Sequence, residues 1–109
     1  MIFTDINDFF VKAAQATRLS KEAEIACAAQ ARAGSARARE QLIESYLFAV
    51  ASCLRRLGED MQTMELLYRL LAVLEREVDA FDFAQDGETF MHRLSLRLRQ
   101  AVTAYVADR

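Results

Sequence analysis

The sequence predicts an all-α fold, a compact bundle of about five helices that forms a single domain over residues 1–109. Proline is absent and only three glycines occur, which leaves too few turn residues for a β-rich domain. Apolar residues also recur at intervals of three and four along most of the chain, the period of helices with one buried face. The hydrophobic fraction of 53% is that of a folded protein rather than a disordered one.

The first two helices are expected over about residues 5–17 and 20–34. Thr4 is predicted to cap the first helix, since its hydroxyl can accept a hydrogen bond from the backbone of the first turn. Ser20 precedes the second helix, which is rich in alanine and ends at Gly34. Small alanine side chains let neighbouring helices approach closely, so this helix is expected to pack against another.

The third helix is predicted over residues 35–58, with Ser35 as its N-cap and Gly58 in a left-handed conformation after its last turn. The fourth helix is predicted over about residues 60–81, and its middle part, residues 66–74, is apolar nearly all round. Such a helix is either central in the domain or covered by a partner, which leaves a homodimer open.

Residues 82–88 are predicted to form the one real loop of the chain, with Asp86 and Gly87 at its turn. The fifth helix is expected over about residues 89–107, where apolar residues again follow the helical period. The chain contains no internal repeat and no low-complexity segment that would change this order of elements.

Charge is distributed unevenly along the chain, although the net charge is only −2. Residues 59–88 hold nine acids and two arginines, a balance of −7, whereas residues 89–109 hold four arginines and one aspartate, a balance of +3. Within the last helix Arg93 and Arg97 lie one turn apart and share with Gln100 a face that differs from the apolar face. An acidic fourth helix is therefore expected beside a basic fifth helix.

The residue types that catalysis needs are largely missing, so the chain is not expected to be an enzyme or to hold a cofactor. His92 is the only histidine, and no glycine-rich phosphate loop occurs. Cys27 and Cys53 are far apart in helical patterns, which predicts reduced core thiols and no metal site. No apolar run reaches the roughly 20 residues of a membrane span, and no basic leader is seen, which predicts a cytoplasmic protein.

Three segments together resemble region two of bacterial sigma factors and the short segment that precedes it. They are “ARAGSARAREQLIESYLFAVASCLRRL” at residues 31–57, “MELLYRLLAVLEREVDAFD” at residues 64–82 and “LRLRQAV” at residues 96–102. They match the family's order and spacing over about residues 23–105. Residues 20–109 are thus expected to form the family-like part, and residues 1–19 an additional N-terminal helix.

The resemblance implies two binding surfaces. In the family, the helix that matches residues 64–81 docks on the clamp helices of the RNA polymerase β′ subunit, and the helix that matches residues 89–105 melts and reads promoter DNA. It therefore implies partner-binding residues on the fourth helix and nucleic-acid-binding residues on the fifth. The former are Glu65, Leu66, Tyr68, Arg69, Leu70 and Val73, and the latter are Phe90, Arg93, Arg97, Arg99 and Gln100.

The chain departs from the family where DNA is melted. The family's tryptophan pair corresponds to Leu96 and Arg97, and Phe90 is the only aromatic residue left near the reading face. Without stacking aromatics, DNA binding is expected to be weak and mainly electrostatic. The chain also ends at Arg109, before the family's later domain, which predicts either a stand-alone, diverged module or a piece of a longer protein.

Two functions therefore remain open. The first is a transcription module that binds RNA polymerase, promoter DNA or both. The second is a protein–protein interaction module, paired with a regulator or with itself, that has kept the sigma fold and lost DNA binding. The basic last helix favours the first, whereas the missing aromatics and the sequence pI of about 5.4 favour the second.

Overall fold

Helices account for nearly all regular structure in the computed structural model, which describes residues 2–85 and 87–109, without the side chains of residues 87–89. No strand occurs in these ranges, and the predicted all-α fold is confirmed. The predicted turn at Asp86 lies outside the described residues. The elements are α1 (Ile6–Gln15), α2 (Lys21–Arg32), α3 (Ala36–Glu44), α4 (Leu47–Arg55), the 3-10 helix η1 (Glu59–Met61), α5 (Met64–Ala80) and α6 (Gly87–Ala107).

Short polar side chains cap four of the helices at their N-termini. Ser20, Ser35 and Thr63 each accept a hydrogen bond from a backbone amide of the first turn of α2, α3 and α5. The cap of α1 is Asp5, whose carboxylate accepts from the amide of Asp8, so the prediction of Thr4 as the cap is wrong by one residue.

The predicted third helix is divided into α3 and α4 at Ser45 and Tyr46. The Ser45 hydroxyl donates to the backbone carbonyl of Leu42 at 2.6 Å, and Tyr46 has a φ of −110°, outside the helical range. The predicted left-handed Gly58 is also wrong, because its φ is −64° and it precedes η1 instead of ending a helix in a left-handed turn. Gly34 is the glycine with a positive φ, +108°, where the chain leaves α2.

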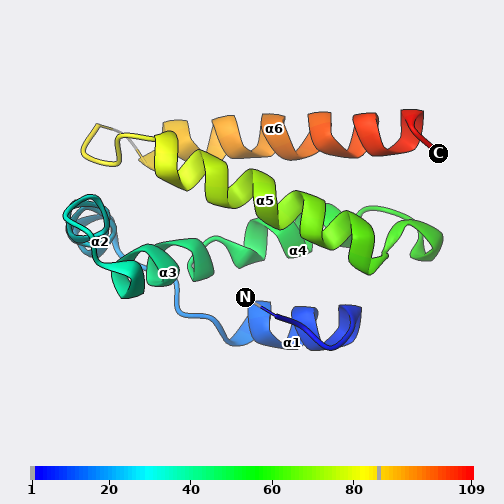
Figure 1. The fold of residues 1–109 in the computed structure, drawn as a ribbon, viewed down its shortest axis with the longest axis horizontal. Coiled ribbons are helices and arrows are strands. Elements are labelled where there is room, and N and C mark those ends of the chain that lie inside the picture. Colours follow the sequence, from blue (N-terminus) through cyan, green and yellow to red (C-terminus); the bar gives the residue numbers. More distant parts are fainter. Residues whose placement is uncertain (1, 86) are drawn as a thin grey trace.

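Figure 1 shows α5 and α6 running side by side, with α4 beneath α5, and α1 below α4 on the side away from α6. Helices α2 and α3 pack against each other at one end of the molecule, where α3 also contacts α5. The C-terminus lies at the other end, beyond the last turn of α6. This arrangement makes α5 the helix that is covered by both α4 and α6.

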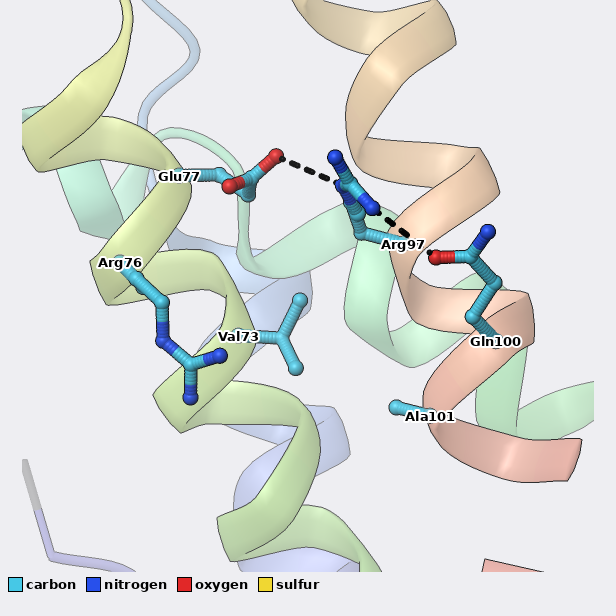
Figure 2. Close-up of a pocket in the computed structure, with 6 residues that line it drawn as sticks. All are labelled: Val73, Arg76, Glu77, Arg97, Gln100 and Ala101. Atoms are coloured by element: carbon cyan, nitrogen blue, oxygen red, sulfur yellow. Dashed lines mark hydrogen bonds and ion pairs between the residues drawn. The ribbon is translucent and has the colours of Figure 1, made fainter. Parts of the chain in front are cut away.

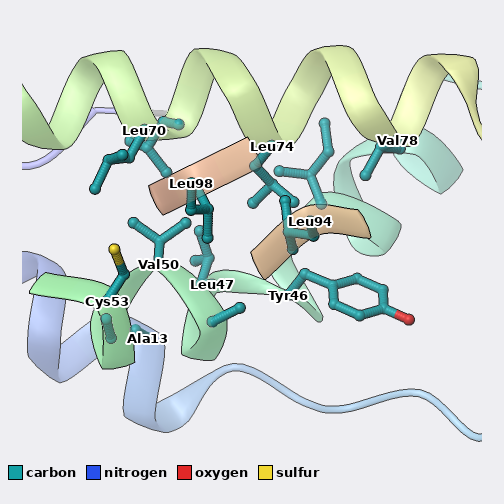
Figure 3. Packing of buried hydrophobic residues seen from close by; sticks show 14 of the residues in the cluster. Ala13, Tyr46, Leu47, Val50, Cys53, Leu70, Leu74, Val78, Leu94 and Leu98 are labelled. Carbon is teal, nitrogen blue, oxygen red and sulfur yellow. The ribbon is translucent and has the colours of Figure 1, made fainter. Parts of the chain in front are cut away.

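One hydrophobic cluster includes buried residues from all six α-helices, and α5 contributes five of its ten buried leucines, more than any other helix. Leu66, Leu67, Leu70 and Leu74 have no exposed surface, which confirms the central position predicted for this helix. The additional apolar residues of α5 are thus buried within one chain. The apolar residues that suggested a homodimer interface are therefore not available to a second copy. Figure 3 shows Leu70, Leu74 and Val78 on α5 facing Leu94 and Leu98 on α6 and Leu47 and Val50 on α4.

A second part of the core is aromatic. The rings of Tyr46, Phe81, Phe83 and Phe90 lie with centroids 4.7–6.4 Å apart, in edge-to-face and tilted pairs. The Tyr46 hydroxyl donates to a carboxylate oxygen of Glu24 at 2.5 Å, and both residues are buried. The aromatic cluster therefore joins α2 and α4 to the start of α6.

Candidate nucleic-acid and partner interface

Helix α6 buries one face and leaves two polar flanks. Leu94, Leu98 and Tyr105 point into the core. Arg93 and Arg97 lie on the flank that faces α5, whereas Arg99 lies on the flank that faces α4. The structure thus separates the three arginines that were expected to contact phosphates together, because a step of two residues along a helix turns the side chain about 200°.

The groove between α5 and α6 has a volume of about 410 Å³ and contains a buried carboxylate (Figure 2). The side chain of Glu77 is only 9% exposed, and its Oε1 accepts a hydrogen bond from Arg93 Nε at 2.9 Å. The same oxygen lies 3.6 Å from Arg97 Nε, and Arg97 also donates to the Gln100 amide oxygen at 3.2 Å. Arg93 and Arg97 thus form intramolecular ion pairs with Glu77, which the sequence pattern did not predict.

Two further side chains shape this groove. Figure 2 shows Val73 of α5 and Ala101 of α6 lining it below the ion pair, and Arg76 extending away from Glu77. Among the residues that the structure describes, Arg76 forms no ion pair. Val73, which was predicted to bind a partner, is therefore half-buried in the wall of this groove.

The expectation that Phe90 stacks on nucleic-acid bases is wrong for this structure. Its ring has no exposed surface and contacts Tyr46, Phe81 and Phe83 at centroid distances of 4.7–5.0 Å. Leu96, at the place of one of the family's tryptophans, is instead 43% exposed on the outer side of α6. The aromatic ring that sequence reasoning assigned to binding is part of the core.

The groove between α4 and α6 was missed by the sequence analysis. It has a volume of about 320 Å³, an apolar floor that includes Met91 and Leu98, and the half-buried ring of Phe48 at its edge. Arg56 at the C-cap of α4 and Arg99 of α6 line it, and among the side chains that the structure describes no carboxylate does. A phosphate that entered it would meet two guanidinium groups, and a base would meet apolar surface.

A third cation lies near this groove. The guanidinium of Arg18, from the segment between α1 and α2, lies over the Phe48 ring with its Cζ 3.9 Å from the centroid. Arg56 donates to the backbone carbonyl of Ser52 at 3.3 Å and keeps its remaining donors free of any side chain that the structure describes. The sequence shows Arg56 and Arg99 only as basic residues of amphipathic helices, and it gives no signal that they face one groove.

The outer face of α5 carries the remaining residues predicted to bind a partner. Tyr68 is 40% exposed, and its hydroxyl lies 3.2 Å from the backbone nitrogen of Phe3, which donates to it. Arg69 pairs with Glu65 at 3.4 Å and lies over the ring of Tyr105. These three side chains of α5 are accessible on one face.

Leu66 and Leu70 do not share this face. Both are completely buried, since they point toward α4 and α6 in the centre of the domain. Their prediction as partner-binding residues is wrong, because the helix needs them for its own core.

The described residues contain no group of three histidine, cysteine, aspartate or glutamate side chains that could hold a metal ion. Cys53 is buried, and burial raises the pKa of its thiol, whereas Cys27 is partly exposed; both thiols are free. None of the helices in the described ranges is long and apolar enough to span a membrane.

Comparison with known proteins adds no further assignment. No family model matches the chain, and neither a curated protein nor a solved structure matches it significantly.

Proposed function

We propose that this chain is a sigma-factor-like transcription module that contacts single-stranded promoter DNA through the groove between α4 and α6. The observation that carries the proposal is the lining of that groove, in which Arg56 and Arg99 flank apolar surface, with no carboxylate among the described side chains that line it. The order and spacing of the motifs in residues 31–57, 64–82 and 96–102 support the choice of DNA as ligand. We place RNA polymerase, through its clamp, on the outer face of α5.

The chemistry of the groove suits weak binding of an unpaired strand. Guanidinium groups bind phosphate oxygens through charge-assisted hydrogen bonds, and the Phe48 ring offers an apolar edge to a base. Two phosphate contacts predict a slope of about −1.4 for log affinity against log salt on a single strand. Affinity is therefore expected to fall about sevenfold between 50 mM and 200 mM salt and to depend little on base sequence.

The second candidate function is a protein-interaction module without DNA binding. Two observations favour it: Glu77 forms ion pairs with both Arg93 and Arg97, and the outer face of α5 keeps Tyr68 and Arg69 accessible. In this function α5 would bind a regulator or polymerase, and the groove between α4 and α6 would have no nucleic-acid ligand.

The test is a titration of a labelled single-stranded oligonucleotide at several salt concentrations. Replacing Arg56 and Arg99 by alanine is expected to flatten the log–log slope by about 1.4 units, because both phosphate contacts are lost. The matched control replaces Lys21 and Arg37, two exposed cations on α2 and α3, and removes the same charge away from the groove. Equal flattening by both pairs would contradict a specific groove.

The same titration separates the two functions when a polymerase clamp-helix fragment is added. Binding of the fragment, weakened by substitution of Arg69, together with no oligonucleotide binding at low salt, would favour the interaction module. If neither ligand binds, the transcription module is wrong, and the interaction module requires a partner other than the polymerase clamp.

A further inference from the structure

We infer that Glu77 is a selectivity residue that closes the α5 side of α6 to phosphate and leaves the α4 side as the nucleic-acid surface. This inference takes its ligand class from the proposed function. Its first observation is the contrast between the two grooves beside α6, since the carboxylate of Glu77 lines the one next to α5, whereas the described side chains that line the one next to α4 include two arginines and no carboxylate.

The geometry of Glu77 explains how one side chain can act on two arginines. Arg93 and Arg97 are separated by one helical turn, and Oε1 of Glu77 lies between their Nε atoms, 2.9 Å from one and 3.6 Å from the other. Figure 2 shows Arg97 pointing across the groove toward α5 instead of outward to solvent. The carboxylate thus occupies the position that a phosphate oxygen would need.

Burial makes this arrangement persistent. The Glu77 side chain is 9% exposed, while Arg93 and Arg97 remain 44% and 49% exposed. A phosphate that captured either arginine would weaken the pairing of a largely buried carboxylate, and a buried charge without its partner is strongly unfavourable. The two arginines are therefore partly exposed, but their guanidinium groups remain paired with Glu77.

The core of the test is Glu77→Gln, which keeps the size of the side chain and removes its charge. Two probes are titrated: a labelled single-stranded oligonucleotide, and inorganic polyphosphate, which carries phosphates and no bases. We expect Glu77→Gln to steepen the oligonucleotide salt slope by about 1.4 units, since two phosphate contacts are gained. Affinity for both probes should rise, and the gain should be larger at low salt than at high salt.

Two sets of variants assign the gain to the arginines. Replacing Arg93 and Arg97 by glutamine in the Glu77→Gln chain should abolish it, whereas the same replacements in the native chain should leave the slope unchanged. Glu77→Asp keeps the charge and should behave like the native chain. If Glu77→Gln does not fold, the replacements of Arg93 and Arg97 in the native chain still decide, because a flattened slope there would show that both arginines already bind phosphate.

The outcomes of the two probes keep the inference apart from the proposed function. If Glu77→Gln gains no polyphosphate affinity, or if the gain survives the loss of Arg93 and Arg97, the inference is wrong. If the gain occurs as expected but the native chain never binds the oligonucleotide, the inference stands and the proposed DNA binding is wrong.

Discussion

The hydrogen bond between Tyr46 and Glu24 provides a sharp test of what holds the aromatic part of the core together. Tyr46→Phe removes one oxygen atom and keeps the ring, so the contacts with Phe83 and Phe90 remain. The lost bond is 2.5 Å long, is buried and has a carboxylate as its acceptor. Burial and the neighbouring Glu24 carboxylate raise the pKa of the Tyr46 hydroxyl, so it remains a donor at neutral pH.

The expected cost follows from these features. A hydrogen bond to a charged group contributes about 1.5–3 kcal/mol to stability, and a buried acceptor that loses its donor costs about 1–3 kcal/mol. Tyr46→Phe should therefore lower the free energy of unfolding by about 2 kcal/mol. For a chain of this length the same change lowers the melting temperature by about 10 °C.

The measurement is equilibrium urea denaturation followed by far-UV circular dichroism, with thermal melts in parallel. The dependence of unfolding free energy on urea should not change, because the surface exposed on unfolding is the same. Glu24→Leu is the second variant, and it leaves the tyrosine hydroxyl without its acceptor. The double variant replaces both polar groups and should cost less than the sum of the two single changes.

Two results would refute this reasoning. One is a Tyr46→Phe protein within about 0.5 kcal/mol of the native chain, the range of ordinary surface substitutions. The other is a double variant whose loss equals the sum of the single losses, which would show that the two groups do not interact.

Two further predictions concern the backbone and a surface ion pair. Gly34→Ala should lower the free energy of unfolding by about 1–2 kcal/mol, because alanine is strained at a φ of +108°. Gly58→Ala should lower it much less, because Gly58 has a φ of −64° and the added Cβ meets only the flexible end of Asp60. Urea denaturation of both variants measures the difference. Hydrogen bonds from Arg39 lower the pKa of Asp79, so their contribution is present above the usual aspartate pKa of 3.8 and is lost as pH falls. Arg39→Gln should cost about 0.2–1 kcal/mol at neutral pH, less at high salt, and nothing at a pH below the lowered pKa of Asp79; urea midpoints across pH and salt measure this.

The helices could be predicted from the sequence because the signals that form them are local. Ser35 caps α3 as expected, α2 begins after Ser20 as expected, and the apolar period of residues 64–81 places the leucines of α5 in the core. The break at Ser45 could not be predicted in this way. It lies in a continuous apolar period, and the Tyr46 side chain that follows it bonds to Glu24, a residue 22 positions away.

The candidate site was harder to predict than the fold, for a physical reason. Sequence spacing places residues on a helix face, but it does not tell which faces meet. Glu77 follows the spacing of a solvated acidic face and is buried only because two arginines of α6 reach it. Phe90 matches the place of a surface aromatic and is buried only because Tyr46, Phe81 and Phe83 gather around it.

The bond between Tyr68 and the backbone of Phe3 has a consequence for the order of folding. Helices α2 and α3, and likewise α5 and α6, are consecutive along the chain and in contact, so these pairs close short loops and form at low entropic cost. The Tyr68–Phe3 contact instead joins residues 65 positions apart. We therefore expect the N-terminal segment with α1 to dock late in folding and to open before the rest of the domain, which hydrogen exchange of the α1 amides would measure.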